Sequence, residues 1–314
     1  MSEGPAGFMV TVGSGDRIHF QDWGGSRGGT LPLETLPVDR DGVLLIHGLS
    51  QTALIWAPVA RRLASEVPTV AMDLRGHGLS DAPTEPGSYD LDVLAADVVA
   101  VAEGSGLLDP PRQAVVLAGH GFGAIVAATA AVALGTRCLG LVLVDGGWEP
   151  MEAALGMEAD EFLRTLEEPP EVMRSMRAFL ADRKSFDPAT WDDDQEAAAR
   201  AAVVETRAGR VVPATRPHAL EGCVRAMFQY DPAATLAAVA APVLALVAGE
   251  NGGGRRTEAL VAASTTRVAA GREAIRSVSL DPVGHNLMRY RPTEVAAAVR
   301  SFDAGPAPRP SSSS

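Results

Sequence analysis

The sequence predicts an α/β protein in which a mostly parallel central sheet is covered on both faces by helices. Short apolar runs of four to six residues alternate with amphipathic segments along much of the chain, and such runs are typical of strands buried on both sides. This alternation stops near Trp148 and resumes at Val243, which indicates an inserted segment. Glycine-containing turns follow several predicted strands, where open α/β sheets place their sites.

The sequence pattern predicts the individual strands and helices of this α/β core. Two alternating segments, Met9–Val12 and Arg17–Asp22, flank a glycine-containing turn and predict a hairpin. Buried strands are predicted at Val43–Ile46, Thr69–Met72, Ala114–Leu117, Gly140–Val144, Val243–Val247 and Ile275–Leu280. Helices are predicted at Leu54–Ala64, Leu91–Glu103, Phe122–Leu134, Arg256–Ala263 and Pro292–Phe302. We therefore expect the core to comprise residues 1–148 and 241–303.

The segment 149–240 differs from the core because it is acidic and lacks strand-like runs other than a weak one at Val211–Val212. Its polar stretches predict helices at Glu158–Glu167, Glu171–Arg183 and Asp192–Val204. We interpret this segment as a helical lid inserted between strands of the sheet. The proline- and serine-rich residues 304–314 predict a disordered tail.

Composition excludes several classes of function. The chain has 314 residues and a formal net charge of −12, and Lys184 is its only lysine, so it lacks the clustered positive charge of a nucleic-acid groove. No signal-peptide pattern or membrane-length apolar stretch occurs, which predicts a cytoplasmic protein without a membrane partner. Cys138 and Cys223 are expected to be buried, reduced thiols. The six histidines are scattered, so we predict neither a metal nor another cofactor, and the sequence does not indicate an oligomeric state.

The sequence Gly119-His120-Gly121-Phe122-Gly123 joins a predicted strand to a predicted helix. A dinucleotide-binding turn would need its third glycine two residues further on. The alternative is a nucleophile elbow, in which small flanking residues let the strand and helix approach and the middle residue occupies a strained turn. We favour the elbow.

Further motifs accompany this turn, and over roughly residues 9–303 the chain resembles the α/β-hydrolases, including lid-bearing bacterial members. The resemblance rests on His47-Gly48, on the elbow, on the stretch from Asp73 to Asp81, on Leu141–Asp145 and on Gly284-His285. It implies an α/β-hydrolase fold and a hydrolase acting on an ester-type bond of a small apolar substrate.

The resemblance also implies roles for individual residues. His285 would be the catalytic base, and the backbone N–H groups of Leu49 and Phe122 would form the oxyanion hole. The acid would be Asp145, with Glu250 as the alternative because Gly252 stands where the family pattern has aspartate. Asp145 has an equally open structural interpretation, in which it caps the turn at its strand end. Residues expected around the substrate are His47, Gly48, Ser50, His120, Trp148 and His218, although His47 also has a structural interpretation.

The chain departs from the family at the elbow, where Gly121 occupies the nucleophile position. Glycine has no atom that can attack a carbonyl, so an acyl-enzyme route is closed. Three hypotheses remain: a hydrolase that has lost its serine, in nature or by engineering; an enzyme that uses a His–Asp general base without a covalent step, such as a lyase, a cyclase or a water-activating enzyme; and a non-catalytic protein that binds a small ligand.

Overall fold

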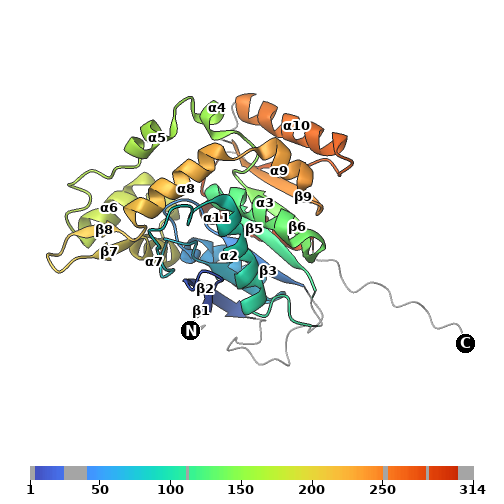
Figure 1. The fold of residues 1–314 in the computed structure, drawn as a ribbon. Coiled ribbons are helices and arrows are strands. Elements are labelled where there is room, and N and C mark those ends of the chain that lie inside the picture. The colour runs from blue at the N-terminus through green and yellow to red at the C-terminus, as the bar shows by residue number, and fades with distance from the viewer. Residues whose placement is uncertain (1–3, 25–40, 111–112, 250–253, 281–282, 303–314) are drawn as a thin grey trace, which may run out of the picture.

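The central sheet of the computed structural model has eight strands in the order β1-β2-β4-β3-β5-β6-β9-β10 (Figure 1). The structure describes residues 4–24, 41–110, 113–249, 254–280 and 283–302. The strands are β1 (Ala6–Thr11), β2 (Arg17–Gly24), β3 (Gly42–Ile46), β4 (Thr69–Met72), β5 (Val115–His120), β6 (Cys138–Val144), β9 (Val243–Ala248) and β10 (Arg276–Leu280). Strand β2 runs antiparallel to β1 and β4, and the remaining pairs are parallel. The predicted hairpin and the mostly parallel sheet are confirmed.

Helices cover both faces of this sheet, and alternate residues of β3 show why. Val43 and Leu45 face a cluster that includes residues of α1 (Ala57–Leu63) and α12 (Pro292–Arg300). Leu44 and Ile46 face the opposite cluster, with α2 (Leu91–Gly104), α3 (Phe122–Leu134) and α10 (Gly254–Ala269). Strand residues point alternately to the two faces, so a wholly apolar strand needs helices on both sides. The α/β class is confirmed.

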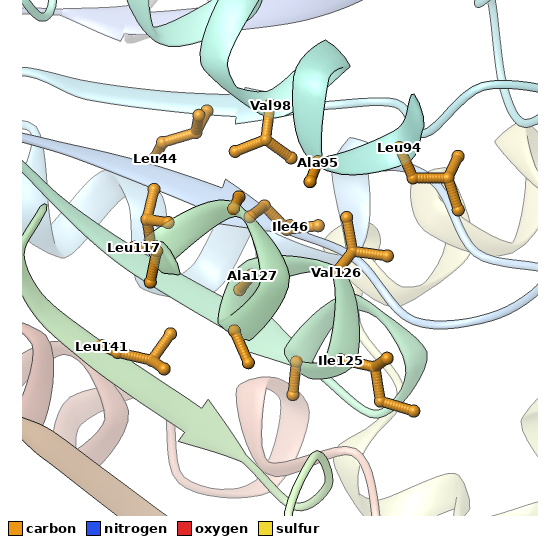
Figure 2. Close-up of a cluster of buried hydrophobic side chains, with 14 of the residues drawn as sticks. Leu44, Ile46, Leu94, Ala95, Val98, Leu117, Ile125, Val126, Ala127 and Leu141 are labelled. Atoms are coloured by element: carbon orange, nitrogen blue, oxygen red, sulfur yellow. The ribbon is translucent and has the colours of Figure 1, made fainter. Parts of the chain in front are cut away.

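Helix α3 is the central helix of the second cluster. Its residues Ile125, Val126 and Ala127 lie between α2 and the strands that carry Ile46, Leu117 and Leu141 (Figure 2). Almost every residue of α3 is buried, as expected for a helix that is apolar on all sides. This packing fixes the first turn of α3, and therefore Gly121, against the carboxyl ends of the strands.

The inserted segment between β6 and β9 is mainly helical. Its helices are α4 (Met151–Leu155), α5 (Ala159–Thr165), α6 (Met176–Phe186), α7 (Asp193–Ala201), α8 (Pro217–Gln229) and α9 (Pro232–Ala238). In Figure 1, α4, α5 and α8 lie on the same side of the molecule, above α3. Helix α9 contacts the core helices α3 and α10, so the last helix before residue 240 packs with the core. The boundary between core and lid stays a prediction.

Two predicted helices of this segment end or begin elsewhere. The predicted helix Asp192–Val204 ends at Ala201, and β7 (Val203–Glu205) pairs antiparallel with β8 (Val211–Pro213). The β-branched valines of the two strands favour pairing, and Gly209, with φ 74°, supplies the turn between them. The predicted helix Glu171–Arg183 begins only at Met176, because the Ser175 side chain accepts a hydrogen bond from the Ala178 N–H and caps the helix.

Cys138 and Cys223 are buried, free thiols, and burial raises the pKa of each to about 12. No helix in the described part of the chain combines the length and apolar character needed to cross a bilayer. The predicted tail 304–314 and the candidate acid Glu250, with Gly252, lie outside the described residues.

Candidate active site

Gly121 forms the sharp turn between β5 and α3, with φ 53° and ψ −116°. The neighbouring glycines allow the strand and the helix to come together. A Cβ atom on Gly119 would lie 2.2 Å from the Gly123 carbonyl oxygen, and one on Gly123 would lie 2.2 Å from the His47 carbonyl oxygen. Both distances are far below van der Waals contact, so the backbone has the close approach that the sequence pattern predicts for an elbow.

His285 and Asp145 form a pair beside this turn. The His285 Nδ1 atom lies 2.6 Å from Asp145 Oδ2. A Cβ atom built on Gly121 would lie 3.2 Å from His285 Nε2, so the second ring nitrogen faces the space where an elbow side chain would begin. Asp145 directly follows β6 and His285 follows β10, which places both at the carboxyl edge of the sheet. The structure therefore brings together Gly121, His285 and the first of the two candidate acids.

The carboxylate of Asp145 is held on both oxygens. Its Oδ1 atom accepts hydrogen bonds from the Ala248 N–H, at 3.0 Å, and from Arg256 Nη1, at 2.9 Å. Burial acts to raise the Asp145 pKa, but the hydrogen bond to His285 and the charge of Arg256 outweigh it, so this pKa lies below its ordinary value. Asp145 is thus an ionised group that fixes the orientation of the imidazole, and it also ties the end of β6 to β9.

Arg256 is itself shared by two carboxylates. Its Nε atom lies 3.0 and 2.9 Å from the two oxygens of Glu149, and its guanidinium lies 5.0 Å from the centre of the Trp148 ring. Burial acts to lower the Arg256 pKa, and the hydrogen bond to Glu149 and the charge of Asp145 raise it above its ordinary value. His285, Asp145, Arg256 and Glu149 therefore form a continuous series of contacts in which the charge of Arg256 lies between two carboxylates.

A second hydrogen-bond network joins the other side of His285 to the loop after β3. Gln51 Oε1 accepts from the Gly48 N–H at 3.0 Å, and its Nε2 donates to Asn286 Oδ1 at 2.9 Å. The His120 ring nitrogens lie 3.1 Å from Gln51 Oε1 and 3.1 Å from the His285 carbonyl oxygen. Burial lowers the His120 pKa well below its ordinary value. The neutral ring has one N–H and donates to one of these two acceptors at a time.

These groups line one cavity of about 520 Å³ at the carboxyl edge of the sheet. Gly121, Leu49 and Phe122 line it, and the backbone N–H of Phe122 belongs to the first turn of α3, where amides lack partners within the helix. The inserted segment contributes the apolar side chains that complete the wall: Met151, Ala154, Leu155, Phe162 and Met227. Gly48 and His120, which the sequence analysis expects around a substrate, also line the cavity.

Four residues predicted around the substrate lie elsewhere. His47 is fully buried below the cavity, with Nδ1 2.7 Å from the Gly48 carbonyl and Nε2 accepting from the Leu74 N–H. Trp148 is buried against Arg256. His218 is exposed and lies 3.2 Å from the Ala82 carbonyl oxygen. Ser50, with φ 58°, lines a neighbouring cavity of about 740 Å³ rather than the one at Gly121. The structure does not bring these four residues to the cavity at Gly121, because a short motif does not show which side of a loop its side chains face.

The sequence interpretation missed Gln51, Glu149, Arg256 and Asn286. Two signals could have found some of them: Asn286 directly follows the Gly284-His285 motif, and Arg255-Arg256 is a run of two bases in an acidic chain. Among the described residues, no group of three or more histidine, cysteine or acidic side chains has the arrangement of a metal site.

The conformation of Gly121 leads to a prediction about stability. A side chain at φ 53° and ψ −116° is strained, and its Cβ would press on His285 at 3.2 Å. We expect Gly121→Ala to lower the free energy of unfolding by about 1–3 kcal/mol, measured by urea denaturation. Gly13→Ala is the matched control, because no atom lies within 4 Å of its Cβ position, and it should change stability by less than about 0.5 kcal/mol. If the two substitutions changed the free energy of unfolding equally, the proposed strain at Gly121 would be contradicted.

The buried histidines predict that stability falls in mild acid. Burial lowers the pKa of His77 from 6.5 to about 3 and that of His120 well below 6.5. The unfolded chain binds protons on these rings below pH 6.5 and the folded chain does not, so each ring lowers the free energy of unfolding as the pH falls below 6.5. Asp97 and Glu149, whose pKa values burial raises, act in the opposite direction. We expect a net loss of about 2 kcal/mol between pH 7.5 and pH 5.5. A constant free energy of unfolding over this range would contradict the prediction.

Comparison with known proteins agrees with this geometry. The model of the "Alpha/beta hydrolase family" matches residues 43–298. The chain is 30% identical over 198 residues to N-formylmaleamate deformylase of Pseudomonas putida, covering 62% of this chain and 63% of that protein. It is 35% identical over 103 residues to epoxide hydrolase 4 of Mus musculus, covering 33% of this chain and 27% of that protein. The chain thus matches less than two thirds of the length of either relative.

Solved structures show the same fold at lower identity. The structure of E-2-(acetamidomethylene)succinate hydrolase superposes with a TM-score of 0.73 at 21% identity, covering 95% of this chain and 98% of that one. The thioesterase domain from the curacin biosynthetic pathway gives a TM-score of 0.69 at 21% identity, covering 95% and 99%. The family match spans most of the chain, and the solved structures that share the fold cover 95% of it. The chain belongs to the alpha/beta hydrolase family.

Proposed function

We propose that this chain is a hydrolase of a small, apolar, ester-type substrate in which His285 and Asp145 activate water directly. The observation that carries the proposal is the position of His285 Nε2, which faces the elbow at a residue without a side chain. A water molecule beside Gly121 would lie where the family pattern has a serine hydroxyl, and it would reach the base without a covalent step.

The chemistry needs one proton transfer in each direction. His285 Nε2 accepts a proton from water as the oxygen attacks the substrate carbonyl carbon, and the backbone N–H groups of Leu49 and Phe122 stabilise the oxyanion that forms. When the tetrahedral intermediate collapses, the C–O bond to the leaving group breaks and His285 returns the proton to the leaving oxygen. Asp145 accepts from His285 Nδ1–H throughout and stabilises the imidazolium.

Two alternatives use the same site. The same base could take a proton from carbon, as in a lyase or cyclase, because proton abstraction needs a base and an oxyanion hole but no nucleophile. The second alternative is a non-catalytic protein that binds a ligand in the cavity. Gly121 favours it, because glycine lacks the side-chain atom that covalent hydrolysis needs.

Hydrolysis of short-chain aryl esters after treatment with a serine-directed fluorophosphonate tests the proposal. We expect turnover above the uncatalysed rate, no label on the chain and no loss of activity, because the base acts on water. Loss of activity together with a label on Ser50 would contradict the proposal. Absence of turnover would also contradict it and would favour another reaction or ligand binding.

A further inference from the structure

The charges that line the cavity are unevenly balanced. Among its described lining residues, Asp145 and Glu149 carry carboxylates and Arg256 carries the only guanidinium. The Arg256 side chain is 17% exposed and those of Asp145 and Glu149 are 0% and 10% exposed. These three side chains therefore give the wall one more negative charge than positive charge, on groups that are little exposed to screening water.

The positive charge of Arg256 is already engaged on two sides. Nη1 donates to Asp145 at 2.9 Å, and Nε lies within 3.0 Å of both Glu149 oxygens. Trp148 lies against the guanidinium. Among the hydrogen bonds of the described residues none involves Nη2, and this nitrogen, which carries two N–H groups, is the donor left for a ligand oxygen. This donor suits an uncharged carbonyl or ether oxygen, because the charge that a carboxylate would need is already neutralised.

The position of Glu149 makes it the side chain that sets the excess of negative charge on the cavity wall. It lies immediately before α4, at the edge of the inserted segment, and it contacts neither His285 nor the elbow through any hydrogen bond among the described residues. Asp145 is needed to orient the base, whereas the partner of Glu149 among the described residues is Arg256. A carboxylate ligand would have to displace Glu149 or stand beside it, and two carboxylates that share a site repel each other strongly.

We propose that Glu149 is a specificity-determining residue that excludes anionic ligands, so that this cavity accepts uncharged substrates. That the ligand is a substrate rests on the proposed hydrolase function. The preference for uncharged over anionic ligands concerns binding alone and does not depend on hydrolysis.

Calorimetric binding of benzamide and benzoate tests the selection, because these ligands share size and shape and differ in charge. We expect the native chain to bind benzamide at least ~10-fold more tightly than benzoate, a difference of about 1.4 kcal/mol. Glu149→Gln keeps the size of the side chain and removes its charge. It should tighten benzoate binding ~10-fold and leave benzamide binding within about twofold.

Two control variants test whether the tighter binding of benzoate comes from Arg256 and from the loss of this particular carboxylate. The double variant Glu149→Gln with Arg256→Gln should lose the gain for benzoate, because the freed cation is gone. Glu221→Gln removes a carboxylate from the exposed face of α8, where Glu221 pairs with Arg225, and should leave both affinities unchanged.

Equal affinity of the native chain for the two ligands, or no binding of benzamide, would overturn the selection, and this comparison needs no variant to fold. An unchanged ratio in a folded Glu149→Gln variant would overturn the role of Glu149. Neither result depends on turnover, so a failure here is distinct from a failure of the proposed hydrolysis.

Discussion

Replacement of Gly121 by serine is expected to raise the turnover of short-chain aryl esters by about 100-fold or more and to create a site for fluorophosphonate. A serine there would start 3.2 Å from His285 Nε2, so its hydroxyl would meet a base that Asp145 already orients. Enzymes of this class lose most of their rate when the nucleophile is removed and keep about 10³–10⁴-fold over water. Restoring the nucleophile should recover part of this loss.

The cost of the substitution is the strain already described for a side chain at this turn. His285 can adjust, because its side chain is 49% exposed and lies on a loop. Gly121→Ala carries the same strain without a hydroxyl, so it is the matched control and should show neither the gain nor the label. A folded Gly121→Ser variant with no gain over Gly121→Ala would contradict the assignment of the base and the oxyanion hole.

Replacement of His285 by alanine is expected to lower native turnover by about 10²–10⁴-fold, the usual contribution of a positioned general base. The loss should appear mainly in kcat, because the ring acts on water, whereas the apolar wall that binds the substrate belongs to other residues. Initial rates over a range of substrate concentrations separate the two constants.

His218→Ala is the matched histidine control. His218 is exposed and lies outside the cavity at Gly121, so its removal should leave kcat within about twofold, as expected of a surface change away from the reacting groups. Native turnover that survives His285→Ala would place the chemistry elsewhere and would contradict the water-activating dyad.

Most of the fold was predictable because burial on two faces leaves a plain sequence pattern. The strand Thr69–Met72 and the helix Phe122–Leu134 have the predicted bounds, since each is an almost wholly apolar run. The exposed segment 149–240 was harder, because Val203–Glu205 gains its partner only from β8. Local polarity there favoured a longer helix, and pairing between strands decided otherwise.

The site was predictable where it depends on backbone turns and not where it depends on charge pairing across the fold. The elbow and the loop His285 follow strand ends, so motif order placed them together. Arg256 and Glu149 are 107 residues apart, and neither has a motif. Gln51 contacts Asn286 across 235 residues. Such pairs exist only after the sheet has brought the loops to one edge, so no local pattern predicts them.

The mass of the intact protein during steady-state hydrolysis of an aryl ester tests the central proposal most directly. If His285 activates water without a covalent step, the native chain should turn over the ester while its mass stays that of the free protein, and Gly121→Ser should accumulate an acyl adduct. An acyl adduct on the native chain during turnover would contradict the account.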